Sequence, residues 1–243
     1  MPATPAWPPR SLPRLFVEQP LAEGEALLLE GKPAHYLANV LRLGEGAEVL
    51  LFDGHSGEWQ ATIEAAHKKK LVLRPTARTR PPEDLPPLTL AFAPVKRAPL
   101  EWLIEKATEL GVARLQPVIT HRTVVERLNP ERLAAIAIEA AEQCGRTRLP
   151  DLLTPLKLDA LLAGPPGHIL FADETGGVPL VPAVQPSPAT ILTGPEGGFT
   201  PEERDRILAA GATGVGLGPR ILRAETAALA ALSLYMAAAG DWR

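Results

Sequence analysis

Two short segments near the C-terminus carry the residue types that could bind a small molecule. The first reads T-G-P-E-G-G-F-T over residues 193–200 and follows an apolar run at residues 189–192. Glycines here permit unusual backbone angles and leave no Cβ in the way of a ligand. Thr200, Pro201 and Glu203 then have the spacing of an N-cap, a first helical residue and a capping-box partner. The segment predicts a strand, a glycine-rich turn and a helix, and a tight loop without a ligand is the alternative.

The second segment reads L-G-P-R-I-L-R-A-E-T-A over residues 217–227 and follows another short apolar run. It places Arg220, Arg223 and Glu225 between the end of a strand and a long apolar helix. A charged cluster in such a position is costly unless its members are paired or used. The residues therefore indicate either a functional site or an Arg–Glu pair that caps the helix.

The chain around these segments alternates strands with helices from residue 88 onward. Helical spacing of apolar residues predicts helices at 99–110, 129–144, 200 onward and 226–239. Short apolar runs predict strands at 88–93, 112–119, 168–172, 189–192 and 215–217. This alternation is typical of an α/β fold with a mainly parallel sheet covered on both faces.

The N-terminal part has a different pattern. It predicts short strands at 14–17, 26–29, 49–52, 59–63 and 71–73, with a helix at 33–43. Several short strands in so few residues favour a small β-barrel. Residues 80–87 contain four prolines and are interpreted as a semi-rigid linker. We therefore predict two domains, residues 1–80 and 81–243.

Composition narrows the class of protein. Hydrophobic residues are 46% and charged residues 22% of the chain, which excludes a disordered protein. The charge-free run at 226–240 is shorter than the roughly 20 residues of a membrane span, and residues 1–13 lack an apolar secretion signal. We expect a cytoplasmic protein with no membrane partner. The single cysteine, Cys144, lies at an apolar helical position and is expected to be buried, and no spacing indicates a metal site.

Charge alone is ambiguous about a nucleic-acid partner. The net charge of −3 argues weakly against one, because phosphates require cations. Residues 65–82, however, hold six Lys and Arg residues and no acid. This run indicates either a solvated face or a set of phosphate contacts.

The two C-terminal segments together resemble the bacterial 16S ribosomal RNA uridine-N3 methyltransferase family, which belongs to the SPOUT class. The resemblance extends to E-K-A-T-E-L-G-V at 105–112, E-A-A-E-Q-C-G-R at 139–146, R-L-F-V at 14–17 and H-Y-L-A-N-V-L-R at 35–42. It covers nearly the whole chain in the family's order. It implies a C-terminal trefoil knot that binds S-adenosylmethionine, an N-terminal PUA-like β-barrel, and a homodimer formed through the C-terminal domain.

The resemblance also implies site residues. The expected partner is 16S ribosomal RNA or the small ribosomal subunit, and no metal is expected. The expected cofactor-binding residues are Leu192, Thr193, Gly194, Glu196, Gly197, Gly198, Leu217, Gly218, Ile221 and Leu222. The expected RNA-binding residues are Arg10, Arg14, Arg42, Lys68, Lys69, Lys70 and Gln143.

Methyl transfer to uridine N3 sets the requirements for catalytic groups. The N3 proton must leave, and negative charge builds on the ring. A guanidinium can stabilise that charge but stays protonated and cannot be the base. Arg223 and Arg146 are therefore candidates for anion stabilisation or phosphate positioning, and Glu225 or Glu196 is the candidate base.

Two other functions fit parts of the pattern. One is a different nucleotide-binding enzyme that uses the glycine-rich turn for phosphates, although the chain lacks G-x-G-x-x-G and G-K-[ST] at this turn. The other is a non-catalytic RNA-binding module, which would need no small-molecule cleft beside Arg223.

Overall fold

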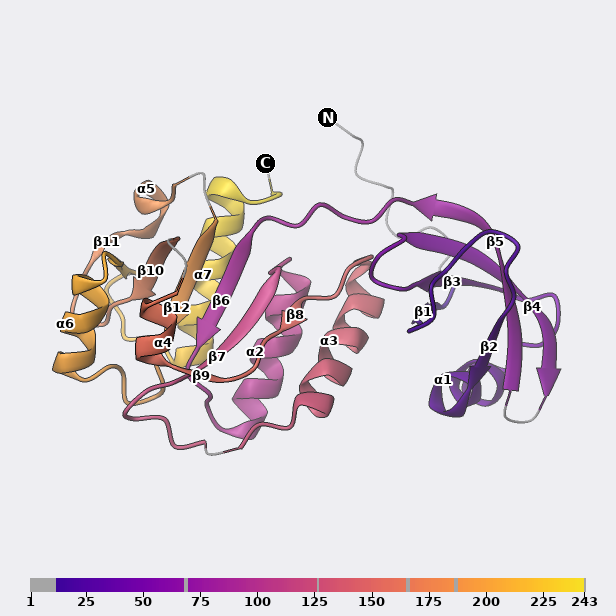
Figure 1. Ribbon diagram of the computed structural model, residues 1–243, viewed down its shortest axis with the longest axis horizontal. Helices are drawn as coiled ribbons and strands as arrows, with labels where there is room; N and C mark the ends of the chain where they lie inside the picture. Colours follow the sequence, from indigo (N-terminus) through magenta and orange to yellow (C-terminus); the bar gives the residue numbers. More distant parts are fainter. Residues whose placement is uncertain (1–11, 68–69, 126, 165–166, 186–187, 243) are drawn as a thin grey trace. The chain divides into compact units, whose positions relative to one another are not determined.

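The computed structural model describes residues 12–67, 70–125, 127–164, 167–185 and 188–242 of the chain (Figure 1). The chain forms two compact units. The first runs to Glu83 and includes Glu142–Arg148, and the second holds Asp84–Ala141 and the chain from Leu149 onward. The predicted boundary after residue 80 did not include the return of residues 142–148 to the first unit, and the domain assignment itself stays a prediction.

The first unit is built on a five-stranded sheet. Its strands are β1 (Arg14–Phe16), β2 (Leu27–Glu30), β3 (Glu48–Phe52), β4 (Glu58–His67) and β5 (Lys70–Arg80). They are hydrogen-bonded in the order β1-β3-β4-β5-β2, with β1 and β3 parallel and the other pairs antiparallel. The sequence predicted five strands here, but β4 and β5 are much longer than expected because they stay paired through register shifts.

One helical segment packs against this sheet. α1 (Gly31–His35) continues directly into the π-helix η1 (Tyr36–Val40), where the sequence predicted a single helix. Ala34 and Leu37 are buried in the same core as Leu51 and Ile63 of the sheet. The segment therefore contributes to the core of the first unit, and its outward residues stay exposed.

A buried carboxylate links the two ends of the first unit's chain. Glu58 lies 2.6 Å from Arg14 Nε and 2.6 Å from a terminal nitrogen of Arg80, measured at its Oε2 atom. Burial alone raises the pKa of Glu58, but hydrogen bonds from Arg80 and Arg14 outweigh it and hold the pKa below its ordinary value of 4.5.

The same two arginines explain why residues 142–148 belong to this unit. Arg14 donates to the carbonyl oxygens of Glu142 and Arg146, at 2.9 and 2.8 Å. Arg80 donates to the carbonyl oxygen of Gly145 at 2.7 Å. Contacts between residues more than 60 positions apart leave no local signal in the sequence, which is why the sequence analysis missed them.

The second unit is built on a parallel sheet. Its main strands are β6 (Leu88–Phe92), β7 (Arg114–Ile119), β10 (His168–Ala172), β12 (Ala189–Thr193) and β13 (Thr213–Gly216). Shorter strands are β8 (Asp151–Leu152), β9 (Leu156–Lys157) and β11 (Val178–Pro179). The order is β11-β13-β10-β12-β6-β7-β8, with β9 also paired to β7, and every pair is parallel.

Helices cover both faces of this sheet, as predicted. Alternate strand residues point to opposite faces, so Leu90 and Ile191 join one core while Ala91 and Leu192 join the other. The first core packs against α2 (Arg97–Glu109), α3 (Pro130–Cys144), α5 (Leu180–Ala183) and α7 (Ala224–Ala239). The second packs against α4 (Leu158–Leu162) and α6 (Pro201–Ala209).

Three further features concern the helices: the exposure of Cys144, the buried face of α7, and the length and apolar character of the helices. The expectation that Cys144 is buried is wrong: it is the last residue of α3 and is exposed. α7 buries one stripe that includes Ala228, Leu232 and Met236, while Leu234 is exposed. None of the helices in the described ranges combines the length and apolar character that crossing a membrane requires.

We expect Glu58→Gln to lower the free energy of unfolding by about 3 kcal/mol near neutral pH, because it removes the carboxylate charge beside the buried Arg14 guanidinium. The folded pKa of Glu58 is lowered, so its contribution is complete above the ordinary value of 4.5 and is lost as pH falls through the folded pKa. Urea unfolding across this range should show the wild-type advantage shrink below pH 4.5.

Glu64→Gln is the matched control. Glu64 lies on the same strand and also pairs with an arginine of β5, but both Glu64 and Arg74 are exposed by about 40%. Solvent screens such a pair, so we expect little change. An equal loss of unfolding free energy in the two variants would show that the buried contacts of Glu58 with Arg14 and Arg80 stabilise the protein no more than an exposed ion pair.

Candidate functional site

A cavity of about 740 Å³ lies at one edge of the parallel sheet in the second unit. Its walls include the loops that follow three neighbouring strands, β10, β12 and β13. In parallel sheets the carboxyl ends of strands meet at one edge, and ligands bind there. The two segments that the sequence singled out are therefore brought together in space, and a third loop joins them.

The loop after β12 carries the glycine-rich motif. The Gly198 N–H donates to the carbonyl oxygen of Pro195 at 2.9 Å, which closes a tight turn. Gly198 has φ +67, and a Cβ there would lie 2.3 Å from a carboxylate oxygen of Glu174. Only glycine fits this position without strain and without moving a neighbour.

The helix that follows begins as the sequence predicted. Thr200 is the N-cap of α6, and its side chain accepts from the Glu203 N–H at 3.2 Å. Glu203 in return accepts from the Thr200 N–H at 3.0 Å. The predicted capping box is confirmed, and it holds the end of the glycine loop at the start of α6.

The loop after β13 supplies the opposite wall and the start of α7. Leu217, Gly218, Ile221 and Leu222 all line the cavity. Ile221 is 85% exposed, which is unusual for a large apolar side chain beside a cavity. An apolar group in that position is available to contact a bound molecule.

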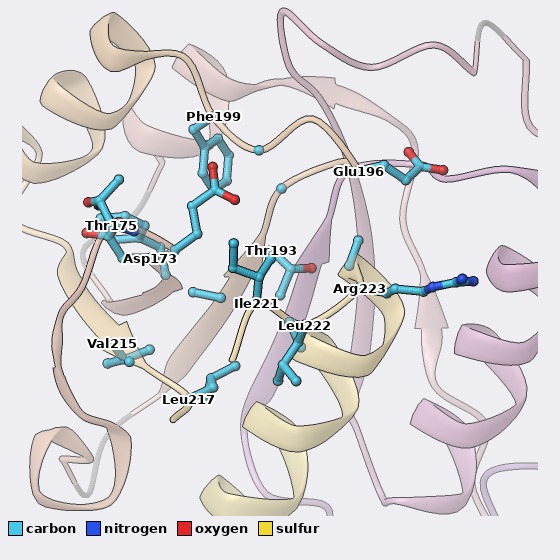
Figure 2. A pocket seen from close by; sticks show the side chains of 18 of the residues that line it. Asp173, Thr175, Thr193, Glu196, Phe199, Val215, Leu217, Ile221, Leu222 and Arg223 are labelled. Carbon is cyan, nitrogen blue, oxygen red and sulfur yellow. Dashed lines mark hydrogen bonds between the residues drawn. The ribbon is translucent and has the colours of Figure 1, made fainter. Parts of the chain in front are cut away.

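The charged residues of this second segment do not form the Arg–Glu pair that was the alternative interpretation. Arg223 is the N-cap residue of α7 and is exposed, and its guanidinium has no hydrogen bond or ion pair within the described residues. Glu225 lies in the first turn of α7, is 9% exposed and also lines the cavity. In Figure 2, Arg223 and Glu196 lie on the side of the cavity opposite Asp173 and Thr175.

The loop after β10, residues 173–176, was missed by the sequence analysis. Asp173 is buried and pairs with Arg204 of α6 at 2.8 Å, and it accepts from the Thr175 hydroxyl at 2.7 Å. Burial alone raises the pKa of Asp173, but hydrogen bonds from Arg204 and Thr175 outweigh it and lower the pKa below its ordinary value. The signal was present: a predicted strand at 168–172 is followed directly by D-E-T-G-G.

Most of the predicted cofactor-binding residues line this cavity. The lining includes Thr193, Gly194, Glu196, Gly198, Leu217, Gly218, Ile221 and Leu222. Leu192 and Gly197 lie in the same segment but not in the wall: Leu192 is buried in a core, and Gly197 packs against Arg122. The binding roles of all ten residues stay predictions.

Arg146, the third predicted catalytic residue, lies in the first unit. It is 5% exposed, and its Nε is 3.7 Å from a carboxylate oxygen of Glu83. Its neighbour Gln143 is exposed. The structure thus places Arg146 in a buried ion pair, and its part in catalysis stays a prediction.

The predicted RNA-binding residues fall into different surroundings. Arg14 is buried in the Glu58 cluster, so we leave it out of the proposed RNA contacts. Lys70 is exposed and pairs with Glu30, whereas Arg42 is exposed with φ +56. Arg10, Lys68 and Lys69 lie outside the described residues.

The basic run is partly neutralised within the first unit. Lys70 pairs with Glu30, Arg74 with Glu64, and Arg80 with Glu58. The side chain of Arg78 is exposed and has no ion pair or hydrogen bond among the residues that the structure describes. The run is therefore less cationic at the surface than its sequence indicates.

Comparison with known proteins identifies the family. Residues 82–236 match the family described as RNA methyltransferase domain, and residues 29–76 match the RNA methyltransferase PUA domain. Ribosomal RNA small subunit methyltransferase E from Rickettsia conorii is 33% identical over 227 residues, which cover 90% of this chain and 93% of that protein. The chain belongs to the ribosomal RNA small subunit methyltransferase E family. The predicted family and the PUA-like N-terminal domain are confirmed.

Relatives and solved structures agree with this assignment. The methyltransferase E of Bacillus subtilis is 31% identical over 241 residues, covering 90% of this chain and 94% of that protein. The methyltransferase E of Neisseria gonorrhoeae, bound to S-adenosylmethionine, has a TM-score of 0.86 at 28% identity and covers 96% and 100% of the two chains. A Legionella pneumophila structure with the same bound cofactor has a TM-score of 0.85 at 32% identity and covers 95% and 99%. The predicted α/β fold is confirmed, and the trefoil knot stays a prediction.

We expect Gly198→Ala to lower the free energy of unfolding by about 1–2 kcal/mol, because an L-residue is strained at positive φ. The added methyl group should displace the Glu174 carboxylate, which is the mobile end of an exposed side chain and moves at little cost. Urea unfolding at constant pH measures the change.

Gly211→Ala is the control for the backbone effect. Gly211 has φ +84 after the end of α6, with no atom within 4 Å of an added Cβ, and it does not line the cavity. The two variants should lose similar stability. A Gly198→Ala protein as stable as the wild type would show that this turn is not strained as described.

Proposed function

We propose that this member of the methyltransferase E family transfers a methyl group from S-adenosylmethionine to N3 of a uridine in 16S ribosomal RNA of the small subunit. The observation that carries the proposal is the convergence of three strand-end loops on one cavity of about 740 Å³. That volume is typical of a small-molecule site. The family assignment and the cofactor seen in the Neisseria relative support it.

The cavity has both kinds of surface that the cofactor requires. Leu217, Leu222 and Val215 offer an apolar wall for the adenine ring. The loop with Asp173 and Thr175 offers polar groups for hydroxyls, and the Asp173–Arg204 ion pair holds this loop in place (Figure 2). The glycine turn lets backbone atoms approach the ligand closely.

The reaction moves one methyl group and one proton. The N3 lone pair attacks the methyl carbon, the carbon–sulfur bond breaks, and its electron pair stays on sulfur to give S-adenosylhomocysteine. The N3 proton must pass to a base, so negative charge develops on the uracil ring before or during transfer. Arg223 is suited to stabilise that charge, because its guanidinium is exposed at the cavity wall and is not committed to an acid in the described chain.

Two carboxylates could accept the proton. Glu225 is buried at the cavity wall, and Glu196 is exposed and accepts from the Lys96 N–H at 3.5 Å. A base works best where water is kept away from the reacting atoms. Burial therefore favours Glu225 over Glu196.

RNA contacts are assigned to the first unit. We propose that Arg42, Lys70, Arg78 and Gln143 contact the RNA, since all four are exposed. Arg42 has a positive φ, so its backbone is strained, and such strain is often found at functional sites. Phosphate contacts of this kind position the RNA rather than read its sequence.

Three further expectations concern the oligomeric state, the chain topology and the cellular location of the protein. We infer a homodimer formed through the C-terminal domain and a trefoil knot around the cavity, both from the family resemblance. The site of action is the cytoplasm, where the small subunit is assembled.

We expect Arg223→Ala to lower methyl transfer about 100- to 1000-fold, the usual loss when one stabilising donor is removed, with cofactor affinity almost unchanged. Primer extension on 16S ribosomal RNA treated with each protein and labelled cofactor would measure the rate and locate the methylated position.

Arg97→Ala is the control for loss of one cation, because Arg97 is exposed on α2 and does not line the cavity. It should keep full activity. A fully active Arg223→Ala protein would end the proposed role of Arg223. RNA binding without any cofactor binding would instead support a non-catalytic RNA-binding module.

RNA affinity should fall steeply with salt, because phosphate contacts release counterions. We expect Arg42→Gln to weaken binding and to reduce the slope of log K against log salt by about one. Arg74→Gln should change the slope less, since Arg74 is already paired with Glu64. Filter binding across a salt series tests both, and salt-independent binding would contradict the proposed contacts.

A further inference from the structure

The turn that follows β7, residues 120–123, is held rigidly by its own side chains. The Thr120 N–H donates to the Thr123 hydroxyl at 3.0 Å, and the two hydroxyls lie 2.9 Å apart. The Thr123 N–H donates back to the Thr120 carbonyl oxygen at 3.2 Å. The turn does not line the cavity, and neither the catalytic nor the RNA-binding proposal uses it.

This turn is hydrogen-bonded to the first turn of α6 and to the glycine-rich loop, both more than 70 residues away in sequence. The His121 N–H donates to a carboxylate oxygen of Glu203 at 2.7 Å. The Arg122 guanidinium donates to the carbonyl oxygens of Gly197 and Phe199, the latter at 3.4 Å.

Glu203 links the cap of α6 to the turn after β7. One oxygen accepts from the Thr200 N–H to close the capping box of α6, and the other accepts from His121. The residue is only 3% exposed, so both bonds are shielded from water. The helix cap and the turn after β7 therefore share one buried carboxylate.

The Arg122 side chain also fills the space beside Gly197. A Cβ at residue 197 would lie 3.2 Å from Arg122 Cδ, so the arginine stem packs directly on the glycine backbone. A loop with glycines at 194, 197 and 198 loses much conformational entropy when it is ordered. Bonds from a rigid neighbour reduce the number of conformations that the loop can adopt before a ligand arrives.

We propose that Arg122 is a positioning residue that pre-orders the glycine-rich loop for cofactor binding. It acts through the carbonyl groups of Gly197 and Phe199 and does not itself contact the cofactor. The cofactor part of this inference rests on the proposed function, whereas the ordering of the loop does not.

The test compares Arg122→Ala, Arg122→Lys and Arg127→Ala with the wild type in the full chain. Arg127 lies in the same connection, is exposed and makes no hydrogen bond or ion pair in the described part of the chain, so its variant controls for the lost charge. Hydrogen exchange of the amides of Gly194 and residues 196–199 is measured without ligand, and calorimetry measures S-adenosylmethionine binding.

In Arg122→Ala we expect exchange of these amides and the Kd each to rise about tenfold, the effect of losing two modest hydrogen bonds. Arg122→Lys should lie between, because one ammonium can reach a carbonyl without the fork geometry. Arg127→Ala should match the wild type.

The inference is overturned if Arg122→Ala leaves loop exchange unchanged, whether or not cofactor affinity falls. It is also overturned if exchange rises and affinity stays the same. If the wild type binds no S-adenosylmethionine but loop exchange still rises in Arg122→Ala, the proposed function fails and the ordering role of Arg122 stands.

Discussion

The structure of the second unit depends on one geometric constraint: β10, β12 and β13 are parallel neighbours or near neighbours whose carboxyl ends lie at the same edge. The loops that leave these strands must meet there, although the first and the last of them start more than 40 residues apart in sequence. The position of the cavity therefore follows from the strand order of the sheet, and the loop residues determine which ligand it can bind.

Bonds to two buried carboxylates hold the loops and the helix around the cavity in place. The Asp173–Arg204 pair attaches the loop after β10 to α6, and the Glu203 carboxylate attaches α6 to the turn after β7. Both acids are buried, so their bonds are strong and hard to replace by water. α6 is thus held from two sides, while Arg223 and Ile221 stay exposed at the opposite wall.

Much of this architecture could be predicted from local patterns. The capping box at Thr200 and Glu203 and the five main parallel strands have short-range signals, namely residue spacing and apolar runs. The elements that were missed, such as β8, β9 and β11, have two residues each and therefore no period to detect. The return of residues 142–148 to the first unit and the reach of Arg122 to Gly197 depend on tertiary contacts that no local pattern contains.

Charge patterns were the least reliable guide. The cationic run of β5 suggested a phosphate-binding face, but Glu30, Glu64 and Glu58 from neighbouring strands or strand ends neutralise three of its cations. Arg14 seemed a surface cation and instead lies beside the buried Glu58. Cross-strand pairing decides whether a charge faces a partner or the solvent, and the register that sets this pairing is not visible in composition.

The central claim is that the three strand-end loops form a single binding site for S-adenosylmethionine. Isothermal calorimetry of the wild-type protein with S-adenosylmethionine, NAD and ATP tests it most directly. The account predicts one site per chain for S-adenosylmethionine and no measurable binding of the other two ligands. Binding of NAD or ATP with no response to S-adenosylmethionine would contradict it.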